Sequence, residues 1–178
     1  MSSQPEAWLR GPVAGIPDAL QPAAHAFVAA GEDVMAPVTE LTPAQLWLQP
    51  GGAASIGFHL MHLAGATDRL LTYARGSGLS DAQKAALAAE RTPPEPRPSA
   101  DELLRAWKDA VEAALRQLAG TPDADLRTAR GVGRAQLPTT VHGLLFHAAE
   151  HATRHAGQII TTAKIVRSLG RSPEASSM

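Results

Sequence analysis

Apolar residues recur every three or four positions along four long stretches of the chain, which is the spacing of an amphipathic α-helix. The stretches cover residues 17–38, 55 to 76 or 78, 99–120, and 139 or 140 to 170. No convincing alternation of apolar and polar residues, the mark of a strand, accompanies them. The pattern therefore predicts an all-α protein, in which four long helices form an antiparallel four-helix bundle after an irregular lead-in over residues 1–16.

Helix-start and helix-stop signals support these boundaries. Thr42 precedes Pro43, and Gln45 follows three residues on, which predicts a short helix that the Pro-Gly-Gly run from Pro50 ends. Ser99 and Glu102 have the spacing of a capping box, and Gly120 follows the last apolar position of that helix. Between the long helices, residues 91–98 predict a stiff proline-rich connector, and residues 120–138 predict a loop.

The length and composition favour a single globular domain. The chain has 178 residues, of which 44% are hydrophobic and only 4% aromatic, so a core of Leu, Ala, Val and Ile is expected. We expect one domain over residues 1–170 and a disordered tail over 171–178. The net charge of −1 provides no basic surface for nucleic acid. No apolar run is long enough to span a membrane and no secretory signal is visible, which indicates a cytoplasmic protein.

Cysteine is absent, which removes several kinds of chemistry. Disulfides, thiolate metal sites and a cysteine nucleophile are all excluded. Any thiol that takes part in a reaction must therefore arrive with the substrate.

Histidines repeat at four-residue steps in the last predicted helix, at His147, His151 and His155. Residues four apart lie on one helix face, so two adjacent members can bind one metal ion through their imidazole nitrogens. All three cannot do so, because the outer two are about 12 Å apart along the axis at a rise of 1.5 Å per residue. Spacing alone leaves open which pair binds.

A third ligand must come from a neighbouring helix, and the second long helix carries His59 and His62 among apolar residues. A buried imidazole is costly unless its nitrogens have partners, and a shared metal ion would provide one. Three histidines with an open position are typical of a catalytic metal site. The alternative is that these histidines are hydrogen-bonded core or surface residues without a metal.

Two segments resemble the DinB/YfiT-like family of small metal-dependent enzymes. They are SIGFHLMHLAGATDRLL, residues 55–71, and HAAEHATRHAGQI, residues 147–159. The resemblance implies that His62, His151 and His155 bind one divalent metal ion, with Zn, Ni and Fe all plausible for imidazole ligands. His59 and His147 lie outside that ligand set and are expected to be packed or solvated, with contact to the site as the alternative.

The resemblance also implies a four-helix bundle of the DinB/YfiT-like type, a homodimer, and a small-molecule substrate, including low-molecular-weight thiols. The leading hypothesis is a metal-dependent enzyme of the hydrolase or thiol S-transferase type. One rival is a non-catalytic metal-binding protein of a stress or damage response, which predicts a closed site without a cavity. Another rival is a helical dimerisation module with structural histidines.

Other polar residues near the histidines give weaker signals. Glu150 is expected to be a surface acid, with a role as a base as the alternative, and the adjacent Asp68 and Arg69 are expected to be solvated. Gln158 is a candidate donor to the site or cap for a neighbouring helix. A set of loop arginines is a candidate contact for an anionic substrate, although solvation is the default: Arg127, Arg130 and Arg134.

Overall fold

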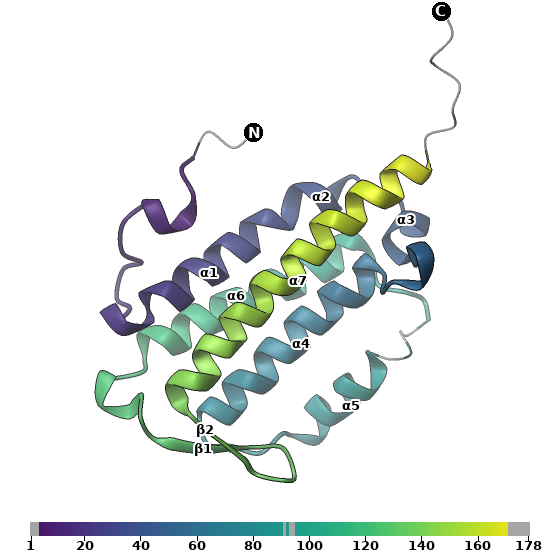
Figure 1. Ribbon diagram of the computed structural model, residues 1–178. Helices are drawn as coiled ribbons and strands as arrows, with labels where there is room; N and C mark the ends of the chain where they lie inside the picture. Colours follow the sequence, from purple (N-terminus) through teal and green to yellow (C-terminus); the bar gives the residue numbers. More distant parts are fainter. Residues whose placement is uncertain (1–3, 91, 93–94, 171–178) are drawn as a thin grey trace, which may run out of the picture.

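A computed structural model describes residues 4–90, 92 and 95–170 (Figure 1). The main elements are α1 (Gln21–Asp33), α2 (Met35–Thr39), α3 (Pro43–Trp47), α4 (Ile56–Ala74), α5 (Asp81–Ala89), α6 (Ala100–Ala119), β1 (Ala129–Val132), β2 (Leu137–Thr140) and α7 (Val141–Leu169). The described part of the chain is therefore mostly helical, as the apolar pattern predicts, with one small two-stranded sheet.

The four long helices α1, α4, α6 and α7 lie side by side (Figure 1). Helix α4 packs against α6 and α7, and α1 packs against the same two helices. In Figure 1, α1 and α7 run in one direction and α4 and α6 in the opposite direction. The α4–α7 and α1–α6 contacts are therefore antiparallel, whereas α1–α7 and α4–α6 are parallel, so the antiparallel arrangement expected from the sequence describes only two of these contacts.

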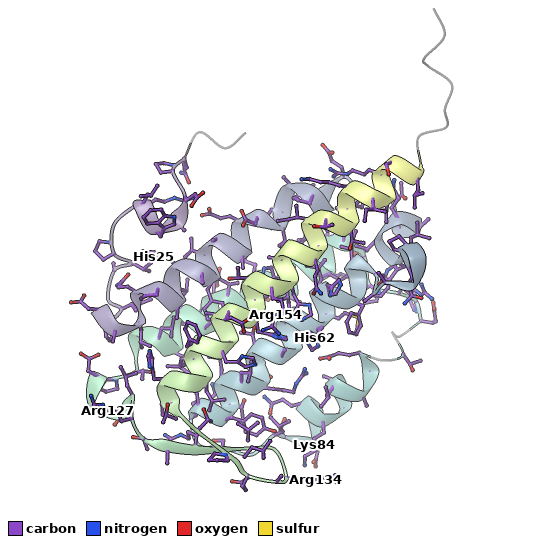
Figure 2. All side chains as sticks on the ribbon, in the orientation of Figure 1. His25, His62, Lys84, Arg127, Arg134 and Arg154 are labelled. Atoms are coloured by element: carbon purple, nitrogen blue, oxygen red, sulfur yellow. The ribbon has the colours of Figure 1, made fainter. Side chains whose placement is uncertain are left out.

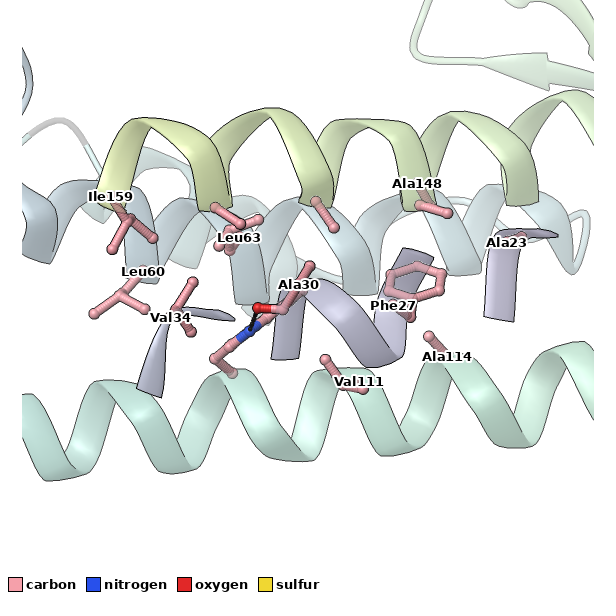
Figure 3. Packing of buried hydrophobic residues seen from close by; sticks show 14 of the residues in the cluster. Ala23, Phe27, Ala30, Val34, Leu60, Leu63, Val111, Ala114, Ala148 and Ile159 are labelled. Carbon is pink, nitrogen blue, oxygen red and sulfur yellow. Dashed lines mark hydrogen bonds between the residues drawn. The ribbon is translucent and has the colours of Figure 1, made fainter. Parts of the chain in front are cut away.

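Apolar side chains from all four long helices meet in one core (Figure 3). Phe27 of α1, Leu63 of α4, Trp107 of α6 and Ile159 of α7 are all fully buried. The indole Nε1 of Trp107 donates a hydrogen bond to the carbonyl of Ala30 at 3.3 Å, so its polar atom is not left unpaired in the core. This core holds α4 and α7 in the fixed relation that the histidines require.

Side-chain caps start the helices where the sequence indicates. Thr42 with Gln45, and Ser99 with Glu102, each form a full capping box at the beginning of α3 and α6. Such caps satisfy backbone N–H groups that the first helical turn leaves unpaired. The first predicted helix is also present, but it breaks at Val34 into α1 and α2.

Two elements were not expected from the sequence. Helix α5 starts at the N-cap Ser80, in a region that the apolar pattern left unassigned, because none of the α5 side chains is buried. The expected loop over residues 120–138 contains a hairpin, in which Ala129 pairs with Thr140 and Val132 with Leu137. Its four-residue strands are half-exposed and contain glycine and proline, so they show no alternating pattern, and predicting only a loop was wrong.

Some predictions concern residues that the structure does not describe. The disordered tail expected over 171–178 lies outside the described residues, as do positions 91, 93 and 94 of the proline-rich connector. None of the helices in the described part of the chain combines the length and apolar character needed to cross a bilayer.

Candidate metal centre

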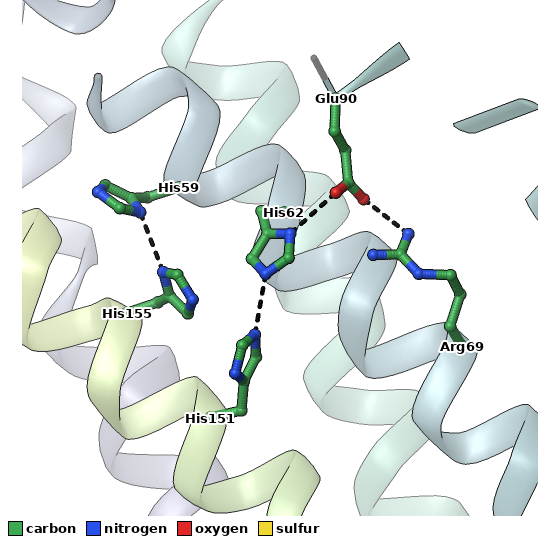
Figure 4. A network of polar contacts seen from close by, with 6 residues as sticks. All are labelled: His59, His62, Arg69, Glu90, His151 and His155. Atoms are coloured by element: carbon green, nitrogen blue, oxygen red, sulfur yellow. Dashed lines mark hydrogen bonds and ion pairs between the residues drawn. The ribbon is translucent and has the colours of Figure 1, made fainter. Parts of the chain in front are cut away.

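Helices α4 and α7 bring His62 and His151 into direct contact. Their Nε2 atoms lie 2.9 Å apart, although the two residues are far apart in the chain. His62 lies in the second turn of α4, and His151 lies in the third turn of α7. The antiparallel packing of α4 on α7 places these two turns opposite each other (Figure 1). Figure 4 shows the two rings pointing toward one another from facing helices.

His155 joins this pair from the next turn of α7. Its ring centroid lies 4.5 Å from that of His151 and 4.8 Å from that of His62. One nitrogen from each of the three histidines lies within 4.8 Å of the others, so together they could hold a metal ion. The structure thus brings together the three residues that the family resemblance implies: His62, His151 and His155.

The other two candidate histidines occupy different places. The Nδ1 atom of His59 lies 3.0 Å from Nδ1 of His155, so His59 is a hydrogen-bond partner of the group rather than a solvated side chain. His147 is largely exposed, and its Nδ1 lies 3.3 Å from Oε2 of Glu150. His147 is not part of the converging group.

Glu90 is a site residue that sequence reasoning missed. Its Oε2 lies 2.8 Å from Nδ1 of His62, and its Oε1 accepts a hydrogen bond of 2.6 Å from Nη1 of Arg69 (Figure 4). Both Glu90 and Arg69 are buried. Glu90 follows an exposed helix and precedes a proline-rich segment, so no sequence signal pointed to it. The expectation that Arg69 is solvated was wrong, because this carboxylate pairs with it.

Burial favours the neutral form of His151 and His155. The pKa of His151 falls to about 4, first because the ring is removed from water and second because of the neighbouring His62. The pKa of His155 also falls to about 4, again mainly through burial and then through His151. Burial and the nearby His62 lower the pKa of His59 as well. An imidazole must be neutral to bind a metal, so these environments suit ligation at neutral pH.

Glu90 is ionised in this setting. Burial by itself raises the pKa of its carboxyl, but the hydrogen bonds from His62 and Arg69 outweigh burial, and the net pKa is lowered. An ionised carboxylate only accepts hydrogen bonds, so Nδ1 of His62 carries the ring N–H and donates a hydrogen bond to Glu90. In the neutral ring, Nε2 of His62 then presents its lone pair toward His151 and His155.

The donor set fits a divalent metal ion. Three imidazoles from two packed helices face one point, and one of them is oriented by a carboxylate through its other nitrogen, as is usual for metal-ligating histidines. The Nδ1 atom of His151 is buried and has no hydrogen-bond partner in the described part of the chain. In this ring, Nε2 faces the convergence point and Nδ1 points away from His62 (Figure 4).

A cavity of about 270 Å³ opens beside the histidines. His62 and His151 both belong to its lining. The rest of the lining is mainly apolar and comes from α4, α5 and the residues before α5: Ala66, Arg69, Leu70, Tyr73, Leu79 and Leu87. A small molecule in this cavity would lie next to the converging imidazoles.

The remaining candidate residues lie outside this group. Glu150 forms ion pairs with Arg154 and His147 at the protein surface, and Gln158 is exposed. Arg130 donates from Nε to the carbonyl of Ala74. Figure 2 shows Arg127 and Arg134 near the hairpin end of the molecule, apart from His62. Asp68 is exposed and accepts a hydrogen bond from Gln83.

Comparison with known proteins agrees with the sequence resemblance. The family model of the DinB superfamily matches residues 26–159, which include α4, the larger part of α7 and all three converging histidines. The chain belongs to the DinB superfamily. No curated protein matches the chain.

A solved structure supports the fold of this DinB superfamily member. The crystal structure of a conserved protein from Enterococcus faecalis superposes with a TM-score of 0.65 at 17% sequence identity. The match covers 84% of this chain and 97% of the other. At that identity the similarity concerns the fold alone.

Proposed function

We propose that the protein binds one divalent metal ion through His62, His151 and His155 and uses it as a metal-dependent enzyme of the hydrolase or thiol S-transferase type. The observation that carries this proposal is the convergence of three imidazoles, two of which line an apolar cavity. Zn, Ni and Fe all suit an imidazole donor set. Membership of the metal-associated DinB superfamily supports the same assignment.

The cavity favours an enzyme over a closed metal store. A site that only retains a metal ion has no need of space beside its ligands, whereas a catalytic site keeps a coordination position open for water or substrate. Here His62 and His151 both line the cavity, so a bound small molecule has access to the site. When bound, the metal ion supplies Lewis acidity that lowers the pKa of water or of a substrate thiol.

Other residues of the chain orient the histidine rings and line the cavity. Glu90 holds the His62 ring through Nδ1, and His59 contacts Nδ1 of His155. Leu70, Leu79 and Leu87 contribute apolar side chains to the cavity lining, which suits the apolar part of a substrate. The chain contains no cysteine, so in the transferase version of the proposal the thiol belongs to the substrate.

Two further features belong to the proposal. We infer that α1, α4, α6 and α7 form the four-helix bundle of the DinB/YfiT-like type, which their mutual packing supports. We also propose that the protein acts on a small molecule, including low-molecular-weight thiols, and that it forms a homodimer. Sedimentation velocity measures the oligomeric state directly.

The experiment that tests the proposal compares Zn-, Ni- and Fe-loaded protein with the metal-free form. One arm follows hydrolysis of ester and amide substrates, and the other follows consumption of low-molecular-weight thiols with electrophilic partners. A matched variant, Leu70→Phe, narrows the cavity without touching the histidines and is expected to reduce turnover at unchanged metal content. Metal binding without turnover in either arm would instead support a non-catalytic metal-binding protein, and absence of metal binding would remove both functions.

A further inference from the structure

Helix α5 lies along α4 without burying any of its own side chains. Its contacts with α4 are polar at both ends. Near its start, Nε2 of Gln83 donates to Oδ2 of Asp68 and to Oγ1 of Thr72, both at 2.7 Å. At its end, the C-cap residue Glu90 reaches His62 and Arg69. Polar contacts therefore attach both ends of α5 to α4, and the buried contact among them is that of Glu90.

The Glu90 carboxylate lies in a place that the sequence of α4 leaves free. His62, Gly65 and Arg69 are three and four residues apart, so they share one face of α4. A Cβ atom on Gly65 would lie 2.6 Å from Oε1 of Glu90 and 2.7 Å from Nη1 of Arg69. Only glycine leaves room here for the ion pair to lie against the helix, one turn from His62.

The two oxygens of Glu90 have separate partners. Oε1 accepts from Arg69 and Oε2 from Nδ1 of His62, so the guanidinium fixes the direction from which the carboxylate meets the imidazole. The exposed fraction of Glu90 is only 6% and that of Arg69 only 8%, so water competes little for these bonds. A neutral imidazole that donates from Nδ1 keeps its Nε2 unprotonated.

We propose that Glu90 is a positioning residue that holds His62 in the form with a free Nε2 and fastens α5 over the cavity beside it. This inference rests on the proposed function, because only the proposed metal site makes Nε2 of His62 a ligand. The Glu90 carboxylate thus connects the His62 ring with the α5 side of the cavity. Leu87 of α5 lines the cavity together with His62 and His151, and Glu90 lies three residues further along the chain.

Two variants test this role in the full-length protein. Glu90→Gln retains size and removes one of the two accepting oxygens, so the side chain can no longer accept from both His62 and Arg69. Gly65→Ala adds a Cβ where the carboxylate lies, while alanine favours a helix more than glycine does, so this variant retains its fold. The matched control is Gly157→Ala on α7, where an added Cβ meets nothing within 4 Å.

Three measurements are made on each protein: Zn affinity by chelator competition, the imidazole tautomers by ¹⁵N NMR without metal, and hydrogen exchange of α5. We expect both site variants to bind Zn roughly 10–100-fold more weakly, as when an outer hydrogen-bond partner of a ligand is lost. We also expect His62 to shift toward the form protonated at Nε2, and the α5 amides to exchange faster. Gly157→Ala is expected to match the wild type.

The NMR readout separates this inference from the proposed function. If wild-type protein bound no Zn, the proposed function would fail, yet a shift of the His62 tautomer in both variants would still show that Glu90 orients the ring. If wild-type protein bound Zn and both variants matched Gly157→Ala in affinity and tautomer, the positioning role would be overturned and the metal site would stand. Unchanged α5 exchange would overturn the fastening of α5 alone.

Discussion

The Nε2 atoms of His62 and His151 lie 2.9 Å apart, each on a different long helix of the protein. Two neutral imidazoles at this distance share one proton between facing nitrogens, or both direct lone pairs at a common ion. The ring of His155 lies next to both. The contact therefore defines the point at which a metal ion is proposed to bind.

Substitution of single histidines tests the ligand set. We expect wild-type protein to bind one Zn ion per chain by elemental analysis after loading, because the three rings converge only once among the described residues. Replacing His62, His151 or His155 by Ala removes a ligand and is expected to abolish tight binding. His147→Ala is the matched control on α7 and is expected to retain it, since His147 lies outside the group. Loss of Zn from His147→Ala with retention in His155→Ala would show that the site lies one turn away.

Acid is expected to destabilise the metal-free protein in a defined range. The pKa of His151 and of His155 is about 4 in the folded protein, against 6.5 for an unperturbed imidazole. Between these values the unfolded chain binds protons that the folded chain does not, so the free energy of unfolding decreases as the pH falls from 6.5 to about 4. Above pH 6.5 both states are neutral and this contribution is constant.

Denaturant unfolding of metal-free protein at intervals from pH 7.5 to 4 measures this effect. The double variant His151→Gln, His155→Gln lacks both imidazoles and is expected to show a shallower dependence. With ordinary imidazole pKa values, protons would displace a metal near pH 6.5. The lowered pKa values of His151 and His155 extend the pH range in which these two ligands are neutral toward pH 5. An equally steep dependence in the double variant would contradict this account.

Removing the cation from the buried ion pair is expected to destabilise the fold. Arg69→Met retains much of the side-chain volume but leaves the Glu90 carboxylate buried with His62 as its remaining partner. Breaking a buried pair in this way costs about 3 kcal/mol in the free energy of unfolding. Lys84→Met, which removes the exposed pair with Asp81, is the control and is expected to have little effect. Chemical denaturation of both variants provides the comparison, and equal stabilities would argue against a buried pair.

The core tryptophan is expected to matter far more than the exposed one. Trp107 is fully buried and donates to the carbonyl of Ala30, so Trp107→Phe loses a hydrogen bond and leaves a gap. We expect a loss of about 1–3 kcal/mol in the free energy of unfolding. Trp8 is 62% exposed, and Trp8→Phe is expected to change stability by less than about 0.5 kcal/mol. Thermal denaturation measures both, and a small effect at Trp107 would indicate looser packing around α6.

Local rules were enough to predict the long helices and their starts. The capping boxes at Thr42 and Ser99 depend on residues three apart, and the apolar faces of α4, α6 and α7 repeat within a single helix. The same helical period placed His151 and His155 on one face of α7. The choice of that pair over His147 and His151, and of His62 over His59, came from the family resemblance, since spacing is the same for both pairs of α7.

Only the tertiary structure determined which residues of different elements contact each other. The antiparallel packing of α4 on α7 sets which turns face each other, and so brings His62 to His151. Glu90 and Arg69 pair beside Gly65, whose lack of a Cβ leaves space for them in the fold, a relation that no local pattern encodes. Helix α5 and the hairpin escaped prediction because neither buries an apolar face. Periodicity reports which side of an element is buried, whereas the partner of a buried charge is set by how the elements pack.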